Sequence, residues 1–350
     1  MSDAIIFGNV DIVFGDRPER ALERMDRGET RETISAETGL VLGVSKASLT
    51  IQEGEILVLM GLSGSGKSTL LRAVNGLAPV VRGSVTVMSK TGSVDPYRCS
   101  PKALRDLRMQ TVSMVFQQFG LLPWRTVAEN VGFGLELAGV PEAERKQRVA
   151  EQLALVNLSS WSDRKVGELS GGMQQRVGLA RAFATGAPIL LMDEPFSALD
   201  PLIRTRLQDE LLEFQHRLKK TILFVSHDLD EAFRIGNRIA IMEGGRIIQC
   251  GTPQEIVRAP ADQYVADFVQ NMNPINMLTA GDIMRNGASP APAPVTATAR
   301  AETPLVDILD ALARQPGVIG IVDNGMVIGT IGAEEVIAGL TRHRRREAVN

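Results

Sequence analysis

Eight consecutive residues, 61–68, between a short apolar run and a helical pattern have the spacing G-x-x-x-x-G-K-[ST] of a loop that binds phosphate. Glycines let backbone N–H groups turn toward an anion, and the following helix N-terminus adds positive potential. Lys67 could then reach the β- and γ-phosphates of a nucleotide, and the Ser68 hydroxyl could ligate Mg²⁺. The flanking strand and helix weigh against the alternative of a chance glycine-rich turn. This phosphate loop comprises Gly61, Leu62, Ser63, Gly64, Ser65, Gly66, Lys67, Ser68 and Thr69.

Two adjacent carboxylates, Asp193 and Glu194, follow the apolar run 189–192. A buried strand ending here would bring Asp193 to the edge of the sheet beside the phosphate loop, where it could hold Mg²⁺ through water. Glu194 would be placed to accept a proton from an attacking water. Taken alone, an apolar run that ends in Asp-Glu is an ordinary strand leaving the core. The phosphate loop upstream favours the catalytic interpretation.

A second helix start with the character of an anion site lies in the segment 169–176, Leu-Ser-Gly-Gly-Met-Gln-Gln-Arg. Ser170, Gly171 and Gly172 open this helix, and Gln174 belongs to the same motif. One nucleotide does not need two phosphate cradles from one subunit. The simplest arrangement is a head-to-tail dimer, in which the helix start at Ser170 of each subunit covers the nucleotide bound by the other subunit. The alternative is a serine-capped helix without further function.

The surrounding residues indicate the elements that position these motifs. Residues 17–42 are rich in charge and predict helix, residues 201–220 predict an amphipathic helix, and residues 239–249 predict a hairpin. Several short apolar runs suit strands buried on both faces of a parallel sheet. The sequence therefore predicts an α/β domain with a mainly parallel sheet. The expected strands are 56–60, 111–116, 189–192, 221–226 and 239–242.

Composition excludes several other classes of protein. The 350 residues, 44% hydrophobic and 23% charged, predict one large and one small domain, or two domains, rather than a disordered chain. A formal net charge of −3 argues against a general attraction to nucleic acid. Cys99 and Cys250 are too few for a disulfide framework, which favours a reduced, cytosolic compartment. No apolar run approaches the ~18 residues of a membrane helix, and the start of the chain lacks a signal-peptide pattern.

The C-terminal part of the sequence predicts a second, small unit. We expect the large domain to span 1–275 and the proline- and alanine-rich residues 276–301 to form a linker. Helices at 304–314 and 333–340 and strands at 318–322 and 326–331 should then form a unit that is small for an independent core. It is expected to need a partner surface. The basic tail 343–350 is expected to be a solvated terminus, with contact to anionic lipid as the alternative.

Over about residues 5–272 these motifs resemble the ATP-binding-cassette (ABC) ATPases. The resemblance implies a P-loop NTPase fold with a RecA-like core, a helical subdomain at about 118–170 and an antiparallel β subdomain. It implies ATP and Mg²⁺ as cofactors and identifies the segment 169–176 as the signature that acts in trans.

The resemblance also implies roles for four residues outside these motifs. Gln117 would ligate Mg²⁺ and link the nucleotide state to a transmembrane partner, and Asp200 would communicate across the dimer. His227 would contact the γ-phosphate, whereas a lone histidine is more often structural. Phe14 aligns with the aromatic residue that stacks on adenine; many relatives carry tyrosine there, and a phenyl ring suffices for stacking.

A narrower resemblance concerns the transported solute. The charged segment 17–42 and the segments 197–204 and 227–232 resemble the cassettes of importers of quaternary ammonium compounds. Residues 302–342 resemble a single cystathionine-β-synthase-type (CBS) repeat, whereas such importers often carry two. The length and the reduced tail favour choline as the solute, with glycine betaine or proline betaine as the alternative.

The resemblance finally implies partners and a location. They are a second copy of the chain, an integral membrane permease and, indirectly, an external substrate-binding protein, with no nucleic acid, at the cytoplasmic face of the cell membrane. The rival is a soluble ATPase of the same superfamily that works on DNA or ribosomes. Such relatives usually carry a long coiled coil or two fused cassettes. Here one cassette is found, without sustained heptads between Lys67 and Ser170.

Overall fold

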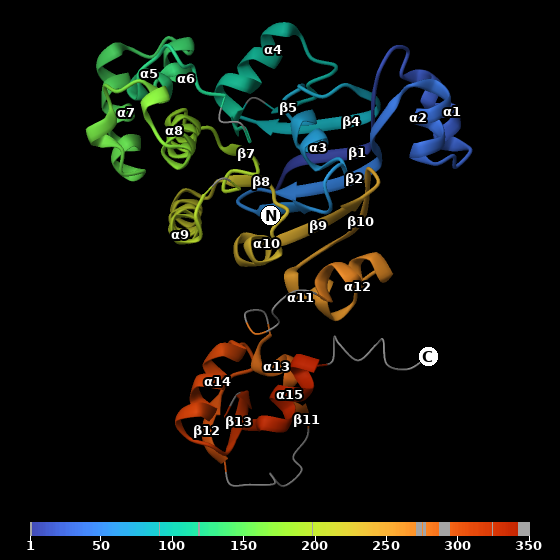
Figure 1. Ribbon diagram of the computed structural model, residues 1–350, viewed down its shortest axis with the longest axis vertical. Coiled ribbons are helices and arrows are strands. Elements are labelled where there is room, and N and C mark those ends of the chain that lie inside the picture. Colours follow the sequence, from blue (N-terminus) through green and yellow to red (C-terminus); the bar gives the residue numbers. More distant parts are fainter. Residues whose placement is uncertain are drawn as a thin grey trace. The chain divides into compact units, whose positions relative to one another are not determined.

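A computed structural model of the chain describes residues 2–90, 92–117, 120–197, 199–270, 275, 278–286, 295–323 and 325–341 (Figure 1). By its internal contacts the chain divides into two compact units, Met1–Cys250 and Gly251–Asn350. This division lies before residue 275, the predicted end of the large domain. Among the helices of the described ranges, none combines the length and apolar character that a membrane span requires.

The first unit contains a six-stranded sheet with the order β10-β9-β3-β8-β7-β6. The pairs from β9 to β6 are parallel, and every residue of β3, β7 and β8 is buried, as their continuous apolar runs predict. The expected strands are therefore confirmed, as is the hairpin of β9 and β10. The strands are β3 (Ile56–Met60), β6 (Val112–Val115), β7 (Ile189–Asp193), β8 (Thr221–Val225), β9 (Arg238–Glu243) and β10 (Arg246–Gly251).

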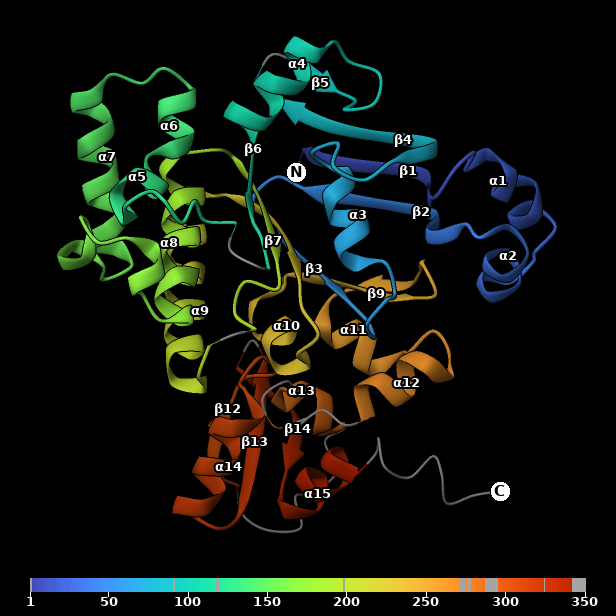
Figure 2. The same ribbon diagram turned by 45° about the horizontal axis from the view of Figure 1, so that its top comes forward.

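A second, antiparallel sheet with the order β2-β1-β4-β5 lies in the same unit. Its strands are β1 (Asp3–Phe14), β2 (Val41–Gln52), β4 (Val80–Ser89) and β5 (Gly92–Val94). Two helices, α1 (Glu19–Asp26) and α2 (Arg31–Thr38), interrupt the chain between β1 and β2, so residues 17–42 are largely helical as predicted. Figure 2 shows these helices beside one end of β1 and β2.

Helices link the strands of the large sheet. The apolar residues Leu207, Leu211 and Phe214 of the predicted stripe on α9 are buried, whereas Leu218 at its end is exposed. These helices are α3 (Lys67–Ala73), α4 (Pro101–Asp106) with the π-helical turn Leu107–Thr111, α9 (Pro201–Leu218) and α10 (Leu229–Ile235).

A separate helical group has its own core, in which Val131, Leu153 and Val177 are buried together. Helix α8 packs against α5 and α7, so the group reaches beyond residue 170, the limit expected for the helical subdomain. Figures 1 and 2 both show these helices together on one side of the unit. The group comprises α5 (Val127–Val131), α6 (Phe133–Leu137), α7 (Glu142–Leu155), α8 (Gly171–Ala184) and the short 3₁₀ turns Ser159–Trp161 and Val166–Glu168.

The second unit is a small α+β structure around a sheet with the order β11-β14-β13-β12. Ile308, Ile319 and Ile331 form part of its core. The helices and strands expected beyond residue 302 are confirmed. The elements are α11 (Pro253–Arg258), α12 (Gln263–Gln270), α13 (Ala280–Ile283), β11 (Arg285–Asn286), β12 (Val295–Ala299), α14 (Leu305–Arg314), β13 (Val318–Asp323), β14 (Met326–Ile331) and α15 (Ala333–Thr341).

The expected linker 276–301 is therefore wrong in part. Strand β12 pairs in parallel with β13, and α13 begins at a capping box formed by Thr279 and Asp282. Asp282 also pairs with Arg258 of α11, which helps to explain why α11 belongs to this unit. The Ala- and Pro-rich composition concealed a short β-branched segment able to join a sheet. Residues 287–294 and the basic tail 343–350 lie outside the described residues.

Candidate functional site

The phosphate loop lies between β3 and α3, as its spacing predicts. Its first and third glycines are required by the backbone. Gly61 has a φ of +142°, and a Cβ there would lie 2.1 Å from the carbonyl oxygen of Met242. Gly66 has a φ of +98°, and its Cβ would lie 2.4 Å from the carbonyl oxygen of Gly43. Any side chain at either position would force the loop open.

Lys67 brings a positive charge into this loop. Its side chain is almost fully buried, and Nζ donates to the carbonyl oxygens of Gly61 and Leu62 at 2.8 and 2.9 Å. Burial lowers the pKa of the amine, and the nearby carboxylates of Glu194 and Asp193 oppose that shift. An anion bound in the loop would lie close to this amine.

Asp193 ends β7 with its side chain fully buried. The Ser68 hydroxyl donates to its Oδ1 at 2.6 Å, and Arg72 Nη2 donates to its Oδ2 at 2.9 Å. Ser68 and Arg72 are four residues apart on α3 and so share one face of the helix. Arg72 is not among the residues predicted from the sequence, although its spacing from Ser68 is a usable signal.

Glu194 turns away from the strand in a left-handed conformation, with a φ of +48°. Its amide donates to the carbonyl oxygen of Val225. Its Oε2 lies 3.2 Å from both Gln117 Nε2 and His227 Nδ1. Gln117 and His227, which are widely separated in the sequence, thus meet at the carboxylate of Glu194. Such a group could accept a proton from water while its neighbours orient that water.

These side chains line a cavity of about 450 Å³, a size that suits a small organic ligand. Of the predicted residues, Gly61, Leu62, Ser65 and Asp193 are not among those that line it. Arg31 of α2 lines it and was not predicted. The lining residues are Phe14, Arg31, Val41, Gly43, Ser63, Gly64, Gly66, Lys67, Ser68, Thr69, Gln117, Glu194 and His227.

A polar network beneath His227 holds its loop. Glu231 is nearly buried and accepts hydrogen bonds from Ser226 Oγ at 2.5 Å and from Gln208 Nε2 at 2.9 Å. Burial raises the pKa of Glu231, and these two hydrogen bonds oppose the shift. Arg204 donates to Asp228, the N-cap of α10, at 2.9 Å. Because Arg204 and Gln208 belong to α9, that helix is tied to Asp228 and Glu231, which follow His227 in the chain.

The signature motif lies apart from this cavity. Ser170 caps α8 by accepting from the amide of Met173, and Gln174 Nε2 donates to the carbonyl oxygen of Leu169 at 3.1 Å. Asp200 caps α9 through the amide of Ile203. None of Ser170, Gln174 and Asp200 lines the cavity. The structure therefore brings together the phosphate loop, Gln117, Glu194, His227 and Phe14, but not the signature or Asp200.

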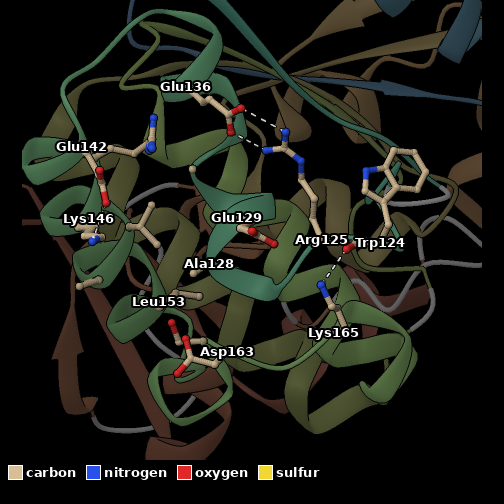
Figure 3. A pocket seen from close by; sticks show the side chains of 15 residues that line it. Trp124, Arg125, Ala128, Glu129, Glu136, Glu142, Lys146, Leu153, Asp163 and Lys165 are labelled. Carbon is tan, nitrogen blue, oxygen red and sulfur yellow. Dashed lines mark hydrogen bonds and ion pairs between the residues drawn. The ribbon is translucent and has the colours of Figure 1, made fainter.

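A larger cavity, of about 840 Å³, lies within the helical group (Figure 3). Its rim carries Trp124, whose side chain is 69% exposed. Lys165 donates to the backbone carbonyl of Trp124 at 2.8 Å, and Arg125 pairs with Glu136. Within the apolar segment 119–124, Leu121 is packed against the helical core, and Phe119 lies outside the described residues.

Comparisons with known proteins agree with this architecture. A family model described as ABC transporter matches residues 44–197. The chain is 50% identical, over 277 residues, to the glycine betaine/proline betaine transport system ATP-binding protein ProV of Escherichia coli K12, covering 79% of this chain and 68% of that protein. It is 43% identical, over 331 residues, to the trimethylamine N-oxide transport system ATP-binding protein TmoW of Ruegeria pomeroyi, covering 94% and 95%.

A solved structure, the dimeric structure of the bacterial ABC transporter cassette MJ0796, is 29% identical with a TM-score of 0.61, covering 71% of this chain and 98% of that one. The fold and the phosphate loop thus define a P-loop ATPase. The chain belongs to the ATP-binding proteins of ABC transporters, and ATP is its substrate.

Proposed function

We propose that the chain is the ATP-hydrolysing subunit of an importer for small zwitterionic methylamines such as glycine betaine, proline betaine or trimethylamine N-oxide. The observation that carries this proposal is its similarity to ProV and TmoW, which are named for these solutes. Each solute pairs a substituted ammonium centre with a negative oxygen, whereas choline is a net cation. The relatives therefore favour the betaine alternative over choline.

ATP binding would use the cavity that Phe14 and the phosphate loop share. Phe14, whose side chain is 39% exposed at the end of β1, offers a ring face to the adenine. Lys67 and the loop amides would hold the β- and γ-phosphates. Glu194 would accept the proton of the attacking water, with Gln117 and His227 fixing its carboxylate. This division of roles follows from the contacts of Glu194 and the burial of Lys67.

The residues also suit Mg²⁺. Ser68 and Asp193 supply oxygen atoms 2.6 Å apart, Gln117 can add an amide oxygen, and Mg²⁺ prefers oxygen ligands. When bound, the ion would neutralise charge on the phosphates. Asp193 is already ionically paired with Arg72, so the buried carboxylate stays positioned for the ion and for the Ser68 hydroxyl.

Hydrolysis would require a second copy of the chain. The signature lies outside the cavity of its own chain, and its helix start has a capping serine and two glycines. In a head-to-tail dimer Ser170, Gly171, Gly172 and Gln174 would cover the partner's nucleotide, and Asp200 would lie near the shared interface. The solved MJ0796 cassette is itself dimeric.

We also infer that the chain works at the cytoplasmic face of the membrane with a permease and an external substrate-binding protein. Recognition of the solute would rest with those partners. The cavity of Figure 3 and the exposed Trp124 beside it supply a docking surface for the permease. The sheet of β11–β14 with α14 and α15 supports a single CBS-like repeat in the C-terminal unit.

Reconstitution of the chain with a candidate permease and a candidate substrate-binding protein tests this function. Labelled glycine betaine, proline betaine, trimethylamine N-oxide and choline are offered separately to vesicles containing ATP. We expect uptake of one or more zwitterions, and uptake of choline alone would overturn the proposed solute class. An ATPase that never co-purifies with a permease would favour the soluble alternative.

A further inference from the structure

The charged segment 17–42 has no role in the site described so far, yet it reaches the nucleotide cavity. Arg31 is the first residue of α2, and its Nη1 donates to the carbonyl oxygen of Gly64 in the phosphate loop at 2.8 Å. Its side chain lines the cavity together with Lys67 and Phe14. A positive charge from outside the phosphate loop thus stands at the edge of the space that the phosphates would occupy.

Helix α2 holds Arg31 in place. Thr30 caps the helix by accepting from the amide of Thr33, and Ile34 is fully buried in a small core shared with Val13 and Ala21. Arg24 of α1 pairs with Glu37 at the other end of α2. The two helices therefore form one braced element rather than a loose loop.

A chain of ion pairs fixes this element to the antiparallel sheet. Asp26 of α1 accepts two hydrogen bonds from Arg82 of β4, at 2.8 and 3.0 Å. Arg82 Nε also donates to the buried Asp11 of β1 at 2.5 Å, and Asp11 accepts from the amide of Lys46. Hydrogen bonding to Arg82 lowers the pKa of Asp26. Arg31 consequently keeps its position relative to the sheet that also carries Phe14.

The chemistry of Arg31 matches the ligand of this cavity. A guanidinium offers five N–H donors in a planar fork that fits phosphate oxygens, and Gly64 accepts from one of its nitrogens. A Cβ at Gly64 would meet nothing within 4 Å, so no other atom packs closely against that position of the loop. We propose that Arg31 binds the phosphate groups of the nucleotide and makes the segment 17–42 part of the ATP site.

The rival role is a mechanical one, in which Arg31 only braces Gly64. Arg31→Gln retains an N–H donor for that carbonyl and removes the charge, whereas Arg31→Lys retains the charge. Arg20→Gln removes an equal charge from the same segment at an exposed position of α1 that does not line the cavity. These three variants separate contact with phosphate from bracing and from the general field of the segment.

The experiment measures the Kd of ATP and of ADP for the full chain by fluorescence titration. This inference rests on ATP binding in the cavity, so wild-type chain and Lys67→Ala are measured first; a wild-type chain that binds no ATP contradicts the proposed function itself. With binding present, we expect Arg31→Gln to raise the Kd about tenfold, since it loses one charge-assisted contact. Arg31→Lys should lose less, and Arg20→Gln should match the wild-type chain.

Amide hydrogen exchange gives a second readout. Nucleotide should slow exchange in residues 31–38 of the wild-type chain and of Arg31→Lys, and this protection should shrink in Arg31→Gln. An unchanged Kd in Arg31→Gln would overturn the proposal, and so would an equal loss in Arg20→Gln. A loss in Arg31→Lys as large as that in Arg31→Gln would also contradict a contact based on charge.

Discussion

The phosphate loop and the signature segment each precede a helix whose N-terminus could bind an anion. Only at the phosphate loop does the same chain also supply the other side chains of the site. Lys67 donates to carbonyl oxygens of the phosphate loop, Asp193 accepts from Ser68 of α3, and Glu194 contacts Gln117 and His227. Ser170 caps only its own helix. A Cβ at Gly66 would collide with backbone, whereas one at Gly171 would meet nothing within 4 Å. In the proposed head-to-tail dimer, the open space at Gly171 would be available to the partner's nucleotide.

The largest effect is expected from a substitution that removes the proton acceptor of the nucleotide site. Glu194→Gln removes the proton acceptor but leaves Lys67 and the phosphate loop intact, so we expect ATP affinity to be kept and turnover to fall about 10²–10⁴-fold. An ATP-bound dimer should accumulate and can be detected by size-exclusion chromatography with light scattering. Glu243→Gln, an exposed carboxylate at the end of the parallel strand β9, is the control. Near-normal turnover in Glu194→Gln would contradict the role of Glu194.

The second effect separates the two helix starts directly. Lys67→Ala removes the buried amine and should weaken nucleotide binding at least about tenfold. Ser170→Arg fills open space at the signature, so nucleotide binding should stay within about twofold while hydrolysis falls to background. Both are measured by nucleotide titration and by phosphate release.

Ser160→Arg, in the exposed 3₁₀ turn of the same helical group, is the matched control for Ser170→Arg. It adds the same side chain away from the signature and should hydrolyse ATP normally. If Lys67→Ala and Ser170→Arg lose nucleotide binding equally, the signature does not act in trans and the comparison of the two helix starts fails.

The sequence predicts local motifs well and contacts between distant residues poorly. Motifs that are continuous in the sequence, such as the phosphate loop and the apolar strands, were found because their spacing reflects local backbone geometry. Arg31 and Arg72 were missed because their partners, Gly64 and Asp193, lie far along the chain. The composition of residues 295–299 predicts a linker, because the pairing of β12 with β13 depends on tertiary structure rather than on composition.

A smaller effect tests the surface of the helical group. Trp124→Ala removes a mostly exposed ring, so the melting temperature and basal ATPase activity should hardly change. If the permease docks here, uptake by the reconstituted complex should fall several-fold, because large aromatic side chains often dominate binding.

Trp161→Ala, on the same helical group but 37% exposed and not lining the cavity of Figure 3, controls for loss of an aromatic ring. It should leave uptake unchanged. A fall in both melting temperature and uptake in Trp124→Ala would instead favour a packing role for Trp124.

The smallest effect concerns the network that supports His227. Burial raises the pKa of Glu231 above 4.5, so above that pH the folded state binds this proton more tightly than the unfolded state. The contribution of Glu231 to stability is therefore full below the ordinary carboxyl pKa and declines as pH rises through its raised pKa.

A glutamine at this position, as in Glu231→Gln, cannot titrate. We expect the free energy of unfolding of the wild-type chain, relative to Glu231→Gln, to decrease as pH rises above the ordinary carboxyl pKa, because the folded state then keeps a proton that the unfolded state has lost. Urea unfolding across this range measures the difference, with Glu243→Gln as the control. Parallel pH profiles for the wild-type chain and Glu231→Gln would mean that Ser226 and Gln208 fully compensate for the burial of this carboxylate.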